Sequence, residues 1–273
     1  MREIIIEPNN TIYNLGVKEV WEYRELLTVL TLRDIKVRYK QTILGVAWIL
    51  FQPSATTLIF SIFFGKIAKF PSAGLPYPLF VFTGLLIWIF FSNGVTVGSN
   101  SLFSNDSIIK KIYFPKIIAP ISAVLTTCID FLVTLLLWII VIFYFHVSPS
   151  PLLLVLFPLL FIFLFMVICG VSFIFSALKA KNRDVRQIFP FILQLGMFVT
   201  PVIYAFDSAS PYQKLFLTLN PLSGIIETLR TTLTGSNNFN WLLIFTSGIV
   251  SAFVFIFGIY YFKRTERHLA DLL

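Results

Sequence analysis

Residues 33–53 read RDIKVRYKQTILGVAWILFQP, and a change of character inside this stretch decides the fold. The first half is basic and amphipathic, and the second half enters an apolar run that continues to residue 64. On a helix the cations share one face and the apolar side chains another: Arg33, Lys36 and Lys40 against Leu32, Ile35 and Tyr39. The pattern predicts a helix at a membrane surface that leads into a first span, although ordinary flanking charges would leave the same composition.

Composition assigns the chain to the membrane. Of its 273 residues, 57% are hydrophobic and only 12% are charged, which is more apolar surface than a soluble domain of this size can cover. The net charge of +8 does not indicate nucleic acid binding, because the basic residues fall in short segments between apolar runs. Cys128 and Cys169 both lie inside predicted spans, which indicates packing residues and neither a disulfide framework nor a metal site.

Six apolar runs have the length that a membrane helix needs, about 17–25 residues or more. Their continuous apolar character favours helices over a barrel. The predicted spans are Ile43–Phe64, Pro78–Val97, Ile117–Phe145, Leu152–Leu178, Ile188–Phe206 and Trp241–Phe262. The sequence therefore predicts an all-α integral membrane protein with a single transmembrane domain: a lead and interface helix at 1–41, a six-span bundle at 42–262 and a tail at 263–273.

The distribution of basic residues predicts the orientation. Of 21 Lys and Arg residues, 17 fall in the lead, in the loops after the second and fourth spans, or in the tail. The positive-inside rule then places both termini in the cytoplasm. Within the lead, an apolar stripe over residues 17–39 predicts one amphipathic helix.

The loop at 98–116 is expected to hold a short helix of about two turns. Its candidate caps are Ser104, Asn105 and Asp106, its stop is Pro115, and it would carry Lys110, Lys111 and Tyr113. Such a helix can dock on a soluble protein, or it is a simple capped turn. The next cytoplasmic loop, ALKAKNRDVRQ at 177–187, is a positive loop that includes Arg183 and Asp184.

The last external segment carries two amphipathic pieces, Tyr212–Leu219 and Leu222–Leu233, separated by Asn220 and Pro221. Each piece is too short to span a bilayer, and both are more apolar than a solvated loop. We therefore expect re-entrant or interfacial helices at the outer mouth. Glu227 and Arg230 are spaced to pair on one helix face.

Few residues have side chains suited to catalysis or to ligand binding. The sequence lacks the glycine-rich loop that cradles nucleotide phosphates, a metal-spaced cluster and a nucleophile–base arrangement, so we expect no catalytic residues and no enzyme. Asp130 is the carboxylate inside a span, and it is either functional or hydrogen-bonded to Thr126, Thr127 or Thr134. Most aromatic residues are expected to face lipid, but a few could line a passage for sugar rings: Trp88, Phe90, Phe91 and Tyr204.

Four segments together resemble one family. They are RDIKVRYKQTILGVAW with the following QP, NDSIIKKIYFPKIIAP at 105–120, KNRDVRQI at 181–188 and NPLSGIIETLR at 220–230. Their order and spacing are similar to those of permease subunits of ABC-2 type exporters, in particular those for O-antigen, capsular polysaccharide and teichoic acid. The resemblance covers nearly the whole chain, from residue 17 to the tail.

The resemblance implies a homodimer that works with two copies of a separate ATP-binding subunit in the bacterial inner membrane. ATP and Mg²⁺ would bind on that partner, and this chain would need no cofactor of its own. The substrate would be a glycan on undecaprenyl pyrophosphate, moved outward. The implied ATPase contacts are Asn105, Asp106, Lys110, Lys111, Tyr113, Arg183 and Asp184. The implied lipid-headgroup and gate residues are Arg33, Lys36, Arg38 and Lys40.

Three other readings remain open at this point. The first is an exporter of teichoic acid, ordinary lipids or drugs within the same superfamily. The second is an ion-coupled carrier that uses Asp130, although such carriers usually have several polar groups at membrane depth. The third is a membrane scaffold without a transport role.

Overall fold

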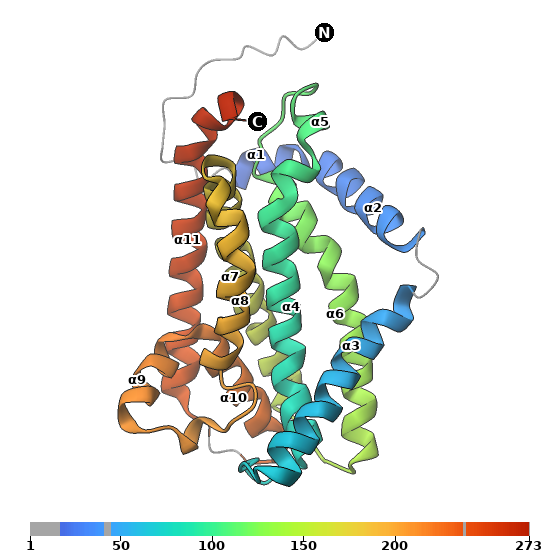
Figure 1. Cartoon of the computed structure of the whole chain (residues 1–273), viewed down its shortest axis with the longest axis vertical. Coiled ribbons are helices and arrows are strands. Elements are labelled where there is room, and N and C mark those ends of the chain that lie inside the picture. Colours follow the sequence, from blue (N-terminus) through green and yellow to red (C-terminus); the bar gives the residue numbers. More distant parts are fainter. Residues whose placement is uncertain (1–16, 41–44, 237–238, 273) are drawn as a thin grey trace.

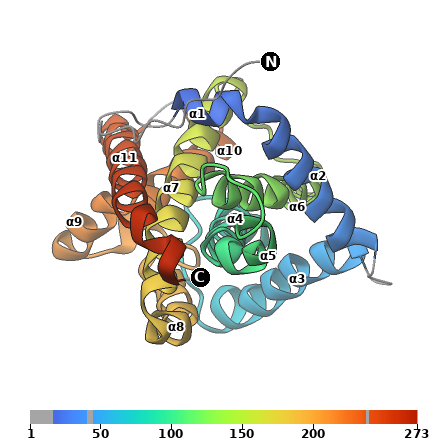
Figure 2. The same cartoon turned by 90° about the horizontal axis from the view of Figure 1, so that it is seen from above.

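The computed structural model describes residues 17–40, 45–236 and 239–272, and over these residues the chain is helical with no β-strand. Helices α4 (Tyr77–Ser104), α6 (Ile118–Tyr144), α7 (Leu153–Lys181) and α11 (Trp241–Leu272) run roughly along the long axis of the molecule (Figure 1). Helix α4 packs against α6 and α7, and α7 packs against α11. Seen from above, α4 lies at the centre and the other helices surround it (Figure 2).

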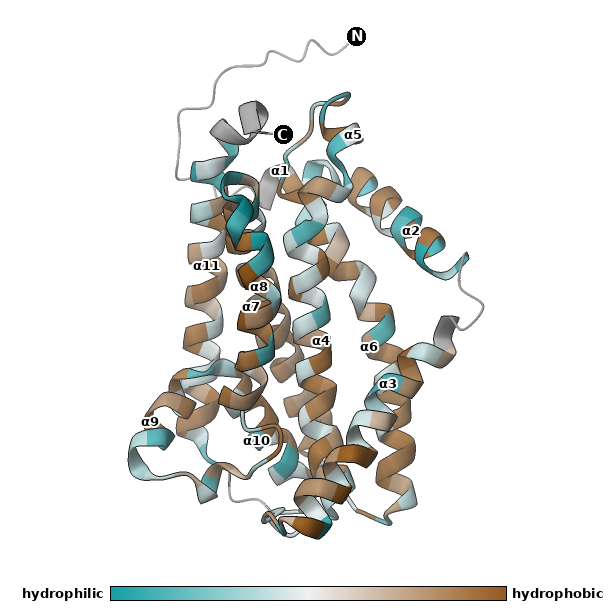
Figure 3. Cartoon of the chain, viewed as in Figure 1, coloured by the Kyte–Doolittle hydropathy of each residue, from teal (hydrophilic) through white to brown (hydrophobic). Residues whose placement is uncertain are grey.

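Within the described ranges, five helices are long and apolar enough to cross a membrane. They are Ala47–Ile67, Tyr77–Ser104, Ile118–Tyr144, Leu153–Lys181 and Trp241–Glu266. The first of them joins α3 (Gly45–Phe60) to a π-helical segment, η1 (Ser61–Ile67). Hydrophobic residues predominate along these helices (Figure 3). The prediction of an all-helical membrane protein is confirmed for these residues. Helices suit a membrane because each backbone polar group is hydrogen-bonded within its own helix.

The predicted span Ile188–Phe206 does not form as one helix. Helix α8 (Arg183–Val199) has 17 residues and stops where Thr200 adopts an extended conformation (φ −92°, ψ 138°). The cause is Pro201, since the residue before a proline is pushed out of the α region. Residues 200–205 then form a non-helical bend before the short η2 (Phe206–Ser208).

Two short helices follow the bend, close to the predicted positions: α9 (Pro211–Leu219) and α10 (Pro221–Leu233). Both begin with a proline in the first turn and a polar cap before it. Ser210 forms a capping box with Gln213, and the side chain of Asn220 accepts from the backbone N–H of Leu222. These helices lie at the end of the bundle opposite to α5 (Asp106–Ile109) (Figure 1).

The two predicted surface helices are shorter than expected. The helix predicted at 17–39 is broken at Tyr23 into α1 (Val17–Glu22) and α2 (Arg24–Lys40). The predicted two-turn helix is a single turn, α5, and Lys110, Lys111 and Tyr113 follow it in turns and irregular chain. The lead at 1–16 and the predicted change of direction at Gln41 and Thr42 lie outside the described residues.

The bundle is held together at a close crossing of α7 and α11. A Cβ atom on Gly258 would lie 2.4 Å from the carbonyl oxygen of Gly170, and one on Gly170 would lie 2.5 Å from that of Val254. Lipid tails are as apolar as leucine, so membrane helices gain contact energy by bringing small residues and backbones together. This crossing therefore fixes the separation of the two helices.

Candidate functional site

Helix α2, which we call the interface helix, packs against α6 along its apolar side. Leu30 is the buried residue of this helix and forms a small core with Phe114 and Ile118. Other valines and leucines of this helix remain exposed, including Val29, Leu32 and Val37. The helix therefore attaches to the bundle around Leu30 and leaves both apolar and charged side chains exposed to its surroundings.

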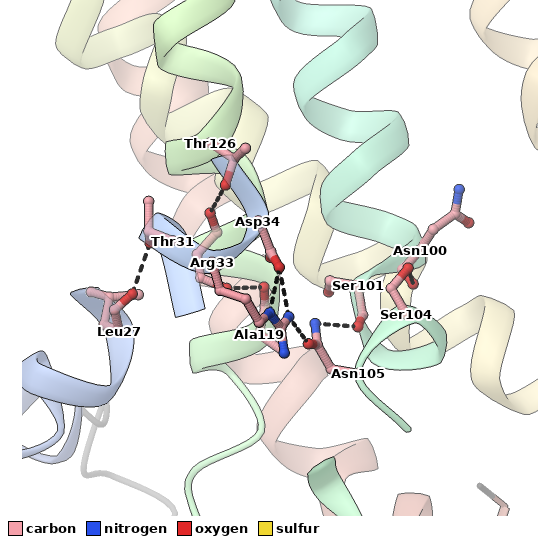
Figure 4. A network of polar contacts seen from close by, with 11 residues as sticks. Leu27, Thr31, Arg33, Asp34, Asn100, Ser101, Ser104, Asn105, Ala119 and Thr126 are labelled. Atoms are coloured by element: carbon pink, nitrogen blue, oxygen red, sulfur yellow. Dashed lines mark hydrogen bonds and ion pairs between the residues drawn. The ribbon is translucent and has the colours of Figure 1, made fainter. Parts of the chain in front are cut away.

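Arg33 ties the interface helix to the end of α4. Its guanidinium forms an ion pair with Asp34, with Nη2 2.6 Å from Oδ1, and also donates to the side-chain oxygen of Asn105 (Figure 4). The amide nitrogen of Asn105 donates to the carbonyl of Ser101 at 3.0 Å, which fixes the orientation of the side chain. Asn105 is buried and is the residue before α5, so the interface helix and α5 share one anchoring point.

Asp130 binds the interface helix at its far end. Its carboxylate lies 2.7 Å from Nη2 of Arg38 and accepts a hydrogen bond from the hydroxyl of Tyr39. Burial, together with this hydrogen bond, raises the pKa of Tyr39 above its ordinary value, so the phenol stays protonated and donates. We call Arg38, Tyr39 and Asp130 the Asp130 cluster.

The expected threonine partners of Asp130 do not bind its carboxylate. The hydroxyl of Thr134 donates to the backbone carbonyl of Asp130, and those of Thr126 and Thr127 donate to Ser122 and Val124. The sequence marked Asp130 as exceptional, but its partners lie on a helix far away in the chain. Tyr39 was not predicted as a site residue, although its position directly after Arg38 could have indicated a role beside that cation.

The four cations that the resemblance assigned to a lipid headgroup divide into two pairs. Arg33 and Arg38 are bound to carboxylates and are partly buried. Lys36 and Lys40 are exposed, one helical turn apart on the interface helix. The two lysines are thus the members of this set that a phosphate can reach without breaking an ion pair.

The segment assigned to the ATPase contact lies exposed beside the interface helix. Lys110 pairs with Asp106 at 2.9 Å across one turn, Lys111 is exposed, and the side chain of Tyr113 is 82% exposed. Arg183 and Asp184 are exposed in the first turn of α8. Buried Asn105 differs from the rest, because its side chain binds Arg33 and faces inward.

Two cationic side chains near the beginning of α8 contact α4. Arg186 lies 3.6 Å from the centre of the Phe103 ring, and its Nε donates to the carbonyl of Lys179. The ammonium of Lys179 donates to Ser99 and Asn100 of α4, at 2.7 and 2.9 Å. These contacts, which join the start of α8 and the end of α7 to α4, were not predicted, because the basic loop resembled a simple topology signal.

The opposite end of α8 is held through Arg230, which is fully buried. Its guanidinium donates to the carbonyls of Pro201 (2.7 Å), Val202 (2.7 Å) and Tyr204 (3.4 Å) in the bend. It also donates to the carbonyl of Phe80 in α4, at 3.1 and 3.2 Å, and stacks 3.5 Å from the ring of that residue. A fixed planar fork of donors suits this multiple contact.

The expected ion pair between Glu227 and Arg230 is not formed in this structure, although both residues are described. Oε2 of Glu227 is buried without a hydrogen-bond partner among the described residues. The hydroxyl of Tyr77 donates to the carbonyl of Ile203 at 2.9 Å. All four carbonyls from 201 to 204 therefore have side-chain donors, which lets a non-helical segment exist at the rim of a membrane protein.

The aromatic channel candidates occupy different environments. Trp88 and Phe90 are buried within the chain, and Phe90 packs on Phe131 with ring centres 4.5 Å apart. Phe91 is half-buried and contacts Trp88. Tyr204 is also half-buried, and its hydroxyl donates to the carbonyls of Phe198 and Val199. Their role in a passage stays a prediction.

Comparison with known proteins identifies the family. The profile of the ABC-2 type transporter matches residues 25–234, so the chain belongs to that family. It is 30% identical over 263 residues to the O-antigen export system permease protein RfbA of Klebsiella pneumoniae, an alignment that covers 96% of this chain and 98% of the relative. The RfbA protein of Myxococcus xanthus is 29% identical over 77% of this chain and 80% of its own length.

A relative with a different name is similar as well. The polysialic acid transport protein KpsM of Escherichia coli is 26% identical over 209 residues, which cover 74% of this chain and 78% of the relative. The chain is thus a multi-pass membrane protein of the ABC-2 family, and its resemblance to permease subunits is confirmed.

Proposed function

We propose that this chain is the channel-forming subunit of an ATP-driven exporter that moves a polysaccharide linked to undecaprenyl pyrophosphate outward across the bacterial inner membrane. Two copies would pair with two copies of a separate ATPase, which binds ATP and Mg²⁺. Relatives named for O-antigen export and polysialic acid transport support the substrate class. Exporters of teichoic acid, lipid or drugs remain the alternative within the family.

One observation carries the proposal: Arg33 joins the interface helix to the corner between α4 and α5 through Asn105. The segment that would dock on the ATPase begins at that corner, and the exposed lysines that would meet the lipid carrier lie on the interface helix. A movement imposed on α5 is therefore passed directly to the helix beside the substrate. A carrier driven by an ion gradient has no need of such a connection.

Orientation and span number form part of the proposal. Helix α8 is about 25 Å long at 1.5 Å per residue, which nearly spans the hydrocarbon core. It runs beside α7 from the α5 end toward the α9 end (Figure 1). We therefore count α8 as a sixth crossing, place the α5 end and both termini in the cytoplasm, and place α9 and α10 as re-entrant helices at the outer mouth.

Asp130 supports the exporter more than an ion-coupled carrier. A coupling carboxylate must bind and release its ion, but this one is held by a guanidinium and a phenol. Because Arg38 compensates its charge, the Asp130 carboxylate suits a structural contact between two helices. Transport by the purified chain without any ATPase would contradict this conclusion.

The test is co-purification with the ATPase encoded beside this chain. The double variant Lys111→Ala, Tyr113→Ala should weaken the complex, because it removes exposed contacts without disturbing buried ones. The matched control is Lys69→Ala, an exposed lysine at the opposite end of the bundle. Equal loss in both variants, or no complex with the unmodified chain, would overturn the assignment.

A further inference from the structure

Beside the Asp130 cluster lies a cavity of about 170 Å³, which we call the Asp130 cavity. It is bounded by α3, α4 and α6, and Arg38 of the interface helix lines it together with Asp130. Its volume equals that of about five or six water molecules in the liquid. This is room for a single small ring.

Two side-chain amides in this cavity have no hydrogen-bonding partner among the residues that the structure describes. They belong to Gln52 of α3 and Asn93 of α4. Each amide carries two N–H donors and one carbonyl acceptor. Thr127 and Thr134 also line the cavity, and their hydroxyls, which donate to backbone carbonyls, retain the capacity to accept.

The charges in the cavity select the class of ligand. Arg38 and Asp130 compensate each other at 2.7 Å, so the site has no net charge. A phosphate would meet the carboxylate, and a cation would meet the guanidinium. The site therefore fits a neutral ligand that both donates and accepts hydrogen bonds.

The walls add a second requirement. Trp48, Phe90 and Phe131 line the same cavity, and the side chain of Trp48 is 56% exposed. Aromatic faces offer apolar contact to a flat ligand, while a few polar groups fix its orientation. A sugar ring combines an apolar C–H face with hydroxyls around its edge, so it meets both requirements.

We propose that the Asp130 cavity is a binding site for one neutral sugar ring, the ring that adjoins the diphosphate of a lipid-linked glycan. The diphosphate would then lie outside the mouth of the cavity, beside the interface helix that contributes Arg38. This inference rests on the proposed function and adds a site that reads the first sugar. Gln52 and Asn93 are the residues that would contact its hydroxyls.

The test compares two probes on the complex with its ATPase, purified in a detergent that has no sugar headgroup. One probe is a short prenyl diphosphate that carries a single hexose, and the other is the same prenyl diphosphate without the sugar. The sugar should improve the affinity about tenfold, and Gln52→Leu or Asn93→Leu should abolish that gain. The affinity of the sugar-free probe should stay unchanged, which shows that each variant is folded.

Gln194→Leu is the matched control, since Gln194 is exposed on α8 outside the cavity. This variant should keep the full sugar-dependent gain. Equal affinities of the two probes for the unmodified complex would overturn the sugar site and leave the proposed function intact. Binding of neither probe would remove the lipid-linked substrate and the site with it.

Discussion

Nη2 of Arg38 lies 2.7 Å from Oδ2 of Asp130, and this ion pair fastens the end of the interface helix to the membrane helix α6. Together with the contact between Arg33 and Asn105, it gives the interface helix two polar attachments. The interface helix is thus held to the bundle by two polar contacts, and each contact can be removed by a separate substitution.

Removing the charge of Asp130 should loosen the interface helix. We expect Asp130→Asn to lower the free energy of unfolding by about 1–2 kcal/mol, less than for a fully buried pair because Arg38 is partly exposed. A double-mutant cycle with Arg38→Gln, followed by thermal unfolding of the purified chain, measures the coupling. Additive effects of the two single changes would show that the pair is not a unit.

Loss of the contact between Arg33 and Asn105 should separate ATP hydrolysis from transport. In Arg33→Gln the complex with the ATPase should assemble and retain its basal ATPase rate, while export falls several-fold. The control is Arg24→Gln, at an exposed position earlier on the same helix. Parallel loss of basal hydrolysis and export would point to misassembly instead.

Arg230 should be among the most sensitive positions in the chain. Replacing it with Leu leaves two buried carbonyls and one partly buried carbonyl of the bend, and that of Phe80, without these donors, so we expect a loss of at least about 3 kcal/mol. Tyr77→Phe removes one donor and should cost about 1 kcal/mol. Urea unfolding in mixed micelles ranks the two variants, and a similar cost for both would contradict the described geometry.

The crossing of α7 and α11 predicts unequal effects for two glycines of one helix. Gly258→Ala places a methyl group 2.4 Å from a backbone oxygen, which cannot move without separating the helices, and should cost about 1–3 kcal/mol. Gly248→Ala meets only the ring of Phe163, at 2.8 Å, and that ring can shift. The second variant should therefore melt close to the unmodified chain, whereas the first should melt clearly lower.

The sequence predicted the long helices well because their signal is additive over some twenty residues. The end of α8 at Val199 was not predicted. The residues remain hydrophobic across Pro201, whereas the helical conformation of the backbone stops before it. The two-turn helix after Asn105 was also wrong, because a favourable cap says where a helix begins and not how far neighbouring packing lets it continue.

The partners of charged groups were the least predictable part. For Glu227 and Arg230, spacing along one helix suggested a pair, but Arg230 reaches backbone carbonyls on two other segments. For Asp130, local threonines were considered, and the partner Tyr39 is 91 positions away in the chain. Such contacts depend on how helices pack, which single-sequence periodicity does not contain.

The bend at 201–204 presents a backbone whose four carbonyl oxygens are already engaged by Arg230 and Tyr77. In an exporter this bend would lie at the outer mouth, where a hydroxyl-rich polymer leaves. Free carbonyls there would bind successive sugars and slow each step of the chain. Because each of these oxygens already accepts from Arg230 or Tyr77, the bend would offer a passing polymer fewer hydrogen-bond acceptors, which would favour its release.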